Sequence, residues 1–534
     1  MSKEISVYTR HDANLTVAEG DSVQKYIEFE KLADKRYFSF DPKGSVFRSQ
    51  FEDLALPHID PKEVSSVVYN WTNNEQLDEL RKIFPTATEW KPVLHHISHV
   101  WSAYMFTEPR ENDLIASIDG GGDLEDYFHI YSFKNGGVHE LLETKVNLGK
   151  AYRVLGLLSP ELYKNQSKGY QMDHALSGKK MSLLSYGTVK EEYRKPMEDF
   201  YNDFMLDYDE KNDSVEKNLS TLLSKIGHGS EKFLDKDTAR DVLATSQDVF
   251  EKIIERHLYP FLGEKKYQRV IMVGGCALNV TMNSKIESDF KVEVFTPPCP
   301  NDCGISLGAA KISNPNLKIL EGPFTNIAPS GKEALAQFEA EFQSKDVTLD
   351  ELASILNKGA IIATMVGPLE IGPRALGNRS YLANPLVSGM KDRLNSPSVK
   401  DREYWRPVAP IITIEKLSEY FDSQNPSPYM TFAPKAKSEY LSLFKEVVHI
   451  DGSARAQTVS KESGWIYNLT KAVGRLSGVE MIMNTSFNKR GHPLINDYGE
   501  ALSIFKESDL NGIVISEKEP AEGERVRLFM KKPL

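Results

Sequence analysis

The amino-acid sequence predicts a mixed α/β fold in two domains, and three observations carry this prediction. The 534 residues exceed what a single hydrophobic core usually supports. Two passages each read as strand, polar or Gly-rich turn, strand and third strand, and a further passage combines a buried strand, a Gly-Gly turn and a helix. Residues 312–344 are rich in Pro, Asn, Gly and Lys, so we place the junction there, with domains at 1–335 and 336–534.

The two strand passages resemble each other. The first, ISVYTRHDANLTVAEGDSVQKYIEFEKL, has a turn at Glu19–Asp21 before its third strand. The second, DLIASIDGGGDLEDYFHIYSFKNGGVHELLE, has a Gly-rich turn with two aspartates after its first apolar run. Their pairing predicts a duplicated nucleotide-handling fold whose turns face one cleft. Residues 75–107, between the passages, are expected to be helical.

The remaining elements follow from periodicity. Residues 190–262 are long, charged and periodic, which indicates helices. RVIMVGGCALNVTMNSKI predicts a buried strand at 270–273, a Gly-Gly turn and a helix, which lets backbone N–H groups approach a nucleotide, although alone this signal is weak. The second domain is expected to start with a helix at 349–356 and a strand at 360–365, and to end in the basic strand RVRLFMKKPL.

Composition narrows the class of protein. Hydrophobic residues make up 40% and charged residues 26%, with no apolar run long enough to span a membrane, so we expect no membrane association. The start, MSKEISVYTRHD, has no apolar signal region, and three cysteines do not form a disulfide framework, so a cytoplasmic location is expected. The net charge of -11 weakens a nucleic-acid partner but leaves a local basic groove open.

A metal site is one candidate centre. In LHHISHVWSAY, His95 and His99 lie four residues apart, so on a helix they project from one face toward one ion. Asp119 and Asp302 each stand beside a Gly turn and offer hard carboxylate ligands, a set that suits a divalent transition metal such as iron. The alternative is a group of solvated or hydrogen-bonded histidines in a cleft.

His11 and Asp12 follow the first strand, where side chains are presented at the mouth of a cleft. A histidine there can act as a general base, because its ordinary pKa of about 6.5 lies near working pH. As an isolated observation, such a pair in a loop is more often a surface feature or a cap.

Cations cluster in the second domain in Gly-Pro and Pro-bounded contexts that a solvated face does not explain. Guanidinium forks together with short hydroxyl and amide donors are what a small phosphate and a nucleotide triphosphate require. The candidates are Arg374, Arg379, Lys400, Arg402, Arg406, Arg455, Asn484, Thr485 and Ser486.

These residues stand in motifs that closely resemble the O-carbamoyltransferase family of nodulation-factor, cephamycin and tobramycin biosynthesis, over nearly the whole chain. The order of GPRALGNRS with NTSFN is highly specific. The motifs are HDAN at 11–14, HHISH at 95–99, DGGGD at 119–123, GKKMSLLSYG at 178–187, GGCALN at 274–279, NDCGISLGAA at 301–310, GPRALGNRS at 372–380, DGSARAQTV at 451–459 and NTSFN at 484–488.

The resemblance implies an actin-like ATPase domain, akin to the tRNA threonylcarbamoyl-transfer enzyme, followed by a twisted α/β domain of the YrdC-like type. In such enzymes the second domain cleaves carbamoyl phosphate to carbamate and adenylates it with ATP, releasing pyrophosphate. The first domain then transfers the carbamoyl group to an acceptor hydroxyl beside an iron ion. The implied cofactors are Fe²⁺ or a similar divalent metal and ATP with Mg²⁺, with carbamoyl phosphate as co-substrate.

The resemblance also implies residue roles. His11, with Asp12, is implied to be the base, and the metal ligands are implied to be His95, His99, Asp119 and Asp302. Carbamoyl phosphate and ATP are assigned to the second-domain cations together with Asn484 and Ser486. Nucleotide and carbamoyl-adenylate binding is assigned to Gly121, Gly122, Lys179, Gly274, Gly275 and Asn279.

The chain departs from the family pattern at GKKMSLLSYG, where GKVMGLAPYG is more usual, and at Trp405, where Phe is more common. The acceptor side of the cleft is therefore open: it takes either 5-hydroxymethylcytosine-type DNA, which calls for a basic rim with aromatic residues, or a sugar or other small metabolite, which calls for a closed polar pocket. A homodimer is left open. Rival interpretations are tRNA threonylcarbamoyl transfer, against which the NTSFN and GPRALGNRS pair speaks, and an inactive scaffold.

Overall fold

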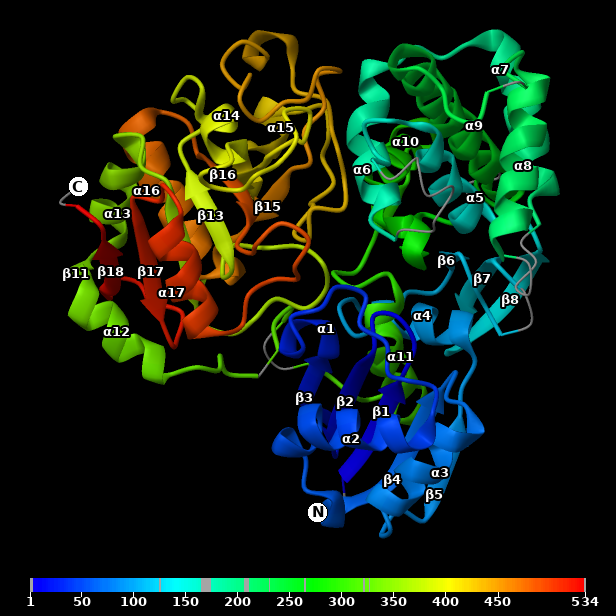
Figure 1. The fold of residues 1–534 in the computed structure, drawn as a ribbon, viewed down its shortest axis with the longest axis horizontal. Helices are drawn as coiled ribbons and strands as arrows, with labels where there is room; N and C mark the ends of the chain where they lie inside the picture. The colour runs from blue at the N-terminus through cyan, green and yellow to red at the C-terminus, as the bar shows by residue number, and fades with distance from the viewer. Residues whose placement is uncertain are drawn as a thin grey trace. The chain divides into compact units, whose positions relative to one another are not determined.

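The first sheet has the strand order β3-β2-β1-β4-β5 in this computed structural model (Figure 1). β1 pairs antiparallel with β2, and β2 with β3, whereas β4 pairs parallel with β1 and with β5. The structure describes residues 3–123, 126–164, 174–205, 211–229, 231–263, 266–319, 322–325 and 327–532. The strands of this sheet are β1 (Lys3–Tyr8), β2 (Asn14–Glu19), β3 (Ser22–Glu28), β4 (Val64–Asn70) and β5 (Glu89–Pro92).

The second sheet repeats this topology. Its order is β8-β7-β6-β9-β10, with antiparallel β6–β7 and β7–β8 pairs and parallel β6–β9 and β9–β10 pairs. The predicted duplication is therefore confirmed, and it is the arrangement expected of an actin-like domain. The strands are β6 (Asp113–Ile118), β7 (Phe128–Lys134), β8 (Gly137–Thr144), β9 (Arg269–Val273) and β10 (Glu293–Phe295).

The third sheet is larger and mixed, with the order β11-β18-β17-β12-β13-β16-β14-β15. Successive residues of β12 point to opposite faces: Ala363 and Met365 pack in one core and Ile362 and Val366 in another, so the sheet is covered on both sides. Its strands are β11 (Gln343–Val347), β12 (Ile362–Val366), β13 (Ser380–Ala383), β14 (Ala409–Thr413), β15 (Gln457–Val459), β16 (Met481–Ser486), β17 (Gly512–Ser516) and β18 (Val526–Met530). Together, the three sheets confirm the predicted α/β class.

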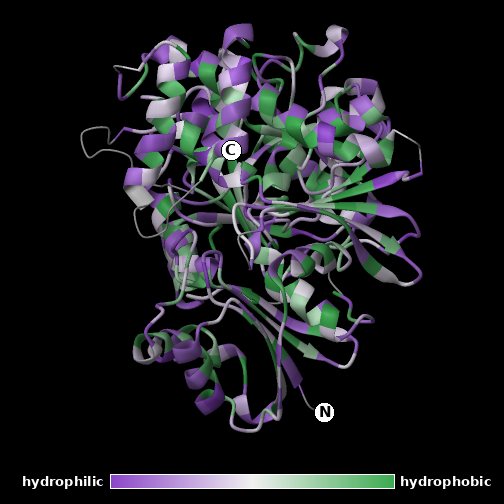
Figure 2. Ribbon diagram, turned by 90° about the vertical axis from the view of Figure 1, so that its right-hand side faces the viewer, coloured by the Kyte–Doolittle hydropathy of each residue, from purple (hydrophilic) through white to green (hydrophobic). Residues whose placement is uncertain are grey.

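Figure 2 shows that hydrophilic and hydrophobic residues alternate along the helices. Those packed with the first sheet are α1 (Phe29–Leu32), α2 (Gly44–Leu54), α3 (Asn74–Ile83), α4 (His95–Ala103) and α11 (Ile305–Ser313). The helices of the second unit, which holds the second sheet, are α5 (Leu148–Val154), α6 (Leu176–Leu183), α7 (Glu191–Asp203), α8 (Lys211–Lys225), α9 (Lys236–Leu262) and α10 (Val280–Phe290). Those packed with the third sheet are α12 (Glu333–Glu341), α13 (Leu349–Asn357), α14 (Met390–Asn395), α15 (Leu417–Tyr420), α16 (Trp465–Ser477) and α17 (Tyr498–Glu507).

The chain packs as two units. The first unit contains residues 1–108 and 297–534, and the second contains residues 109–296. The predicted junction between residues 335 and 336 falls within the first unit and stays a prediction. Among the described residues, no helix combines the length and apolar character that crossing a bilayer requires.

Two expectations for local structure were wrong in part. The expected helical stretch 75–107 contains β5. α3 ends at Ile83, and Phe84, the residue before Pro85, disfavours helical geometry, so the helix does not continue. The irregular stretch 312–344 contains α12 and the start of β11. α12 turns only Ala334 and Phe338 into the core, so its short apolar stripe is hidden among polar residues. The helices expected across 190–262 and at 349–356 are confirmed.

Candidate active site

The first unit brings three predicted metal ligands together. α4 begins at His95, which places His95 and His99 one turn apart, and Asp302 stands just before α11. The two histidine Nε2 atoms lie 3.1 Å apart, and Asp302 Oδ1 lies 3.6 Å from His95 Nε2 and 3.4 Å from His99 Nε2. All three side chains are buried.

This donor set fits a divalent transition metal. Ligands bonded to one ion at about 2.0–2.2 Å lie roughly 3.0–3.5 Å from one another, close to the separations observed here. Burial alone would raise the pKa of Asp302, but the neighbouring imidazoles of His11, His95 and His99 outweigh it and hold that pKa well below its usual range. The carboxylate is therefore charged and suited to a cation.

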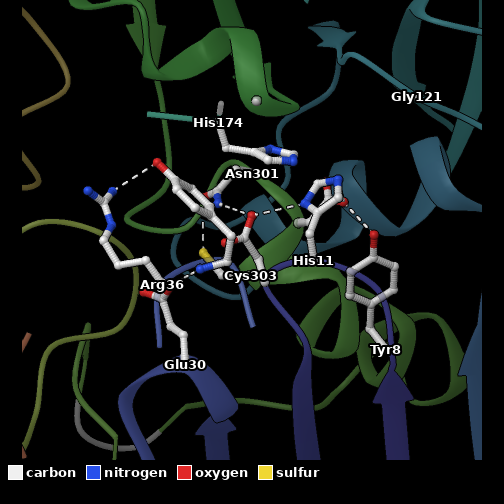
Figure 3. Close-up of polar contacts among 12 residues, drawn as sticks. Tyr8, His11, Glu30, Arg36, Gly121, His174, Asn301 and Cys303 are labelled. Carbon is white, nitrogen blue, oxygen red and sulfur yellow. Dashed lines mark hydrogen bonds and ion pairs between the residues drawn. The ribbon is translucent and has the colours of Figure 1, made fainter. Parts of the chain in front are cut away.

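His11 lies beside this group (Figure 3). Its Nδ1 is 3.3 Å from Asp12 Oδ2, and its Nε2 is 3.5 Å from Asp302 Oδ2. Tyr8, the last residue of β1, donates its hydroxyl to the same Asp302 oxygen at 2.5 Å. Asp12 adopts a left-handed backbone with φ of 61°, which turns the chain back toward β2. The His11 side chain is 40% exposed, so a ligand can reach it.

Asp119 belongs to the second unit, where it follows β6. Its carboxylate accepts backbone N–H bonds from Gly121 at 3.1 Å and Gly275 at 2.5 Å. Gly274 has φ of 83°, and a Cβ there would lie 2.3 Å from the Ile118 carbonyl oxygen, so the chain approaches β6 as only glycine allows. The Gly-rich turns at Gly121 and at Gly275 are therefore both bonded to Asp119. The metal-binding role of Asp119 stays a prediction.

The other residues assigned to the nucleotide in this unit are Asn279, Gly122 and Lys179, and their nucleotide-binding roles stay predictions. Asn279 caps α10 by accepting the Met282 N–H at 3.1 Å, and its amide donates to Gln247 at 3.0 Å, so its polar atoms serve the fold. Gly122 makes a close approach, since a Cβ there would lie 1.9 Å from an Asp126 carboxylate oxygen. Lys179 is half-buried on α6.

The predicted cations of the first unit form a cluster, defined here as Arg374, Lys400, Arg402, Arg406 and Arg455. Burial, followed by Arg406 and Arg36, lowers the pKa of Arg374 to about 10. Burial, followed by Arg374, Arg402 and Arg406, lowers the pKa of Arg455. Buried positive charges repel one another, and a bound anion would offset this repulsion.

The polar neighbours of the cluster come from β16 and the residues after it. Arg402 donates to Thr485 Oγ1 at 2.7 Å, and Lys400 donates to the Asn488 carbonyl at 2.9 Å and to Ser486 Oγ at 3.3 Å. Within the described part of the chain, the buried Nε atoms of Arg374 and Arg455 have no hydrogen-bond partner. These donors are available to a ligand, and among the same described residues the buried Nε of Arg379 likewise has no partner.

Arg379 and Asn484 are placed differently. Arg379 is fully buried, and its guanidinium donates to the carbonyls of Val366 at 3.0 Å and Gly367 at 3.1 Å. Asn484 donates its side-chain amide to the Ala375 carbonyl at 2.9 Å. Both fix the loop that carries Arg374, so their assigned contacts with ATP or carbamoyl phosphate stay predictions.

Sequence reasoning missed Arg36. Its charge acts on Arg374, Lys400 and Arg406, and its guanidinium donates to the Tyr37 hydroxyl at 3.0 Å (Figure 3). No local motif marks Arg36, because its partners lie more than three hundred residues away in the chain.

Comparison with known families identifies the protein class. Residues 28–311 match the family model described as the carbamoyltransferase N-terminus, and residues 353–519 match that of the carbamoyltransferase C-terminus. The chain belongs to the carbamoyltransferase family. The two matched stretches end and resume on either side of the expected domain junction.

This carbamoyltransferase is 30% identical to nodulation protein U of Bradyrhizobium diazoefficiens, over 92% of this chain and 93% of that protein. It is 32% identical to nodulation protein NolNO of Sinorhizobium fredii over 79% of this chain, but the match covers 62% of that longer protein. Among solved structures, HypF of T. kodakarensis aligns with a TM-score of 0.35 and 14% identity, over 58% of this chain and 48% of that one.

Proposed function

We propose that this carbamoyltransferase uses ATP and carbamoyl phosphate to carbamoylate a hydroxyl group. The observation that carries the proposal is the pairing, within one unit, of an imidazole–carboxylate group at His95, His99 and Asp302 with the cluster of buried cations. An anhydride formed at the cluster would be consumed beside the imidazoles.

The cluster fits the first half of this reaction. Water hydrolyses carbamoyl phosphate to carbamate and inorganic phosphate. A carbamate oxygen then attacks the α-phosphate of ATP and displaces pyrophosphate. Every species in this step is anionic, and the buried guanidiniums of Arg374 and Arg455 offer unused donors to hold them. The pyrophosphate leaving group takes the charge of the broken P–O bond.

His11 fits the second half. The acceptor oxygen attacks the carbamoyl carbon, and AMP leaves with the electrons of the C–O bond. Asp12 lies against His11 Nδ1, which orients the ring so that Nε2 can take the acceptor's proton. A divalent ion held by His95, His99 and Asp302 would supply Lewis acidity that offsets negative charge on the reacting oxygen.

For the acceptor we propose a small-molecule hydroxyl. The net charge of -11 opposes a polyanion such as hydroxymethylated DNA. Mass spectrometry of both kinds of acceptor after incubation tests this choice: a carbamoyl gain on a small hydroxyl compound supports it, and a gain only on DNA overturns it.

Exchange of labelled pyrophosphate into ATP tests the chemistry. We expect exchange only when carbamoyl phosphate is present, because adenylate formation is reversible. Exchange that requires L-threonine and bicarbonate instead would support threonylcarbamoyl transfer. Absence of exchange with either set of substrates would overturn the proposal. His11→Gln serves as the matched variant, since it should keep the exchange and lose transfer to the acceptor.

A further inference from the structure

A second group of metal-ligating side chains lies in the first unit, apart from the imidazole site. It consists of Asp34, which follows α1, His492, in the loop after β16, and Glu500, in the first turn of α17. One ligand atom from each lies within 4.8 Å of the others, and His492 Nδ1 is 2.8 Å from Asp34 Oδ2. Three segments from opposite ends of the chain therefore converge on one small volume.

The charges around this group favour a cation. Asp34 and Glu500 supply two carboxylates to this group, whose negative charge a bound cation would offset. The side chains of His492 and Asp34 are 40% and 48% exposed, so an ion could enter from solvent and keep water ligands. One imidazole nitrogen with two carboxylates is a donor set that zinc and similar ions accept.

The group is also connected to the cation cluster. The backbone carbonyl of His492 accepts a hydrogen bond from Asn488 Nδ2 at 2.5 Å, and Asn488 in turn accepts one from Lys400. On the other side, Asp34 lies two residues before Arg36, whose charge reaches the cluster. An ion at this position would fix both segments that border the cluster.

We propose that Asp34, His492 and Glu500 form a second, surface-accessible site for a divalent transition metal such as Zn²⁺, which ties the segment carrying Arg36 to the loop carrying Asn488. The site is distinct from the imidazole group and does not depend on the proposed reaction. By holding these segments together, the ion would order the cation cluster.

Equilibrium dialysis against Zn²⁺ tests this site. The full-length chain should bind one more equivalent of zinc than His492→Gln, and Glu500→Gln should show the same loss. His228→Gln is the matched control, because His228 pairs with a single carboxylate, Glu231, at 2.9 Å, and this variant should bind as much zinc as the unmodified chain. If the imidazole site binds no zinc, the number of zinc equivalents falls equally for all these proteins, and the difference between the unmodified chain and His492→Gln is unchanged.

Amide hydrogen exchange gives a second readout. With Zn²⁺ present, exchange across residues 484–492 should slow several-fold in the unmodified chain and stay unchanged in His492→Gln. Equal zinc stoichiometry in the unmodified chain, His492→Gln and Glu500→Gln, each folded by circular dichroism, would overturn the proposal. If His492→Gln fails to fold, Asp34→Asn takes its place, since Asp34 is exposed.

Discussion

The Nε2 atoms of His95 and His99 lie 3.1 Å apart inside a fully buried pocket, with one Asp302 oxygen within 3.6 Å of both. Two neutral imidazoles can share one proton at this distance, but an ion satisfies both lone pairs and the carboxylate at once. We therefore expect His99→Gln to bind less metal than the unmodified chain, measured by elemental analysis of the purified protein. His139→Gln, an exposed control, should retain it.

His11→Gln should reduce carbamoyl transfer by about 10²–10⁴-fold, the usual contribution of a positioned general base. Pyrophosphate exchange should stay near the unmodified level, because His11 is not part of the cation cluster. Single-turnover transfer with a preformed intermediate measures the effect. Equal losses of exchange and transfer would contradict the assigned role.

Arg374→Met should raise the KM for carbamoyl phosphate at least about tenfold, the equivalent of about 1.4 kcal/mol, because a buried guanidinium with an unused donor is lost. Arg256→Met, which removes an exposed guanidinium paired with Glu198, is the control and should leave KM unchanged. A KM unaffected in both variants would remove Arg374 from the binding site.

Glu251 gives a pH-dependent stability. Burial raises its pKa to about 7, so the folded chain keeps a proton that the unfolded chain, with a pKa near 4.5, releases. Stability from this group is full below pH 4.5 and is lost as pH rises toward 7. Glu251→Gln should therefore gain about 3 kcal/mol relative to the unmodified chain at pH 8 and little at pH 4.5, measured by denaturant unfolding. An equal gain at both pH values would contradict this cause.

Gly274→Ala should destabilise the chain by more than about 2 kcal/mol, because it combines a left-handed backbone with a Cβ 2.3 Å from the Ile118 carbonyl oxygen. Gly20→Ala separates the two effects, since Gly20 has φ of 57° and open space around its Cβ. Its cost should be about 1 kcal/mol. Thermal unfolding of both variants gives the comparison, and equal shifts would show that the close approach contributes nothing.

Local patterns in the sequence predicted much of the fold. The strands around the two Gly/Asp turns were readable because alternation and turn residues act over a few positions, and the helical spacing of His95 and His99 was readable for the same reason. β5 was missed because four mostly exposed residues carry no hydrophobic pattern.

The roles of individual site residues were harder to predict from the sequence than the fold. Arg379 and Arg374 stand five residues apart in one motif, yet Arg379 donates to backbone carbonyls, whereas Arg374 lies within reach of the charges of Arg406 and Arg36. Residue type alone cannot separate these roles, because burial and hydrogen-bond partners are set by distant segments. Arg36 was missed for the same reason, since only the folded chain brings it to the cluster.

The position of Arg36 bears on how this carbamoyltransferase can be divided. A fragment that starts at residue 336 would keep the large mixed sheet and its own cations but would lack the guanidinium supplied from the amino-terminal end. Expressing the two halves separately would thus leave the cation cluster without Arg36 until they reassociate. Continuity of the polypeptide guarantees that every copy carries all the positive groups in equal number.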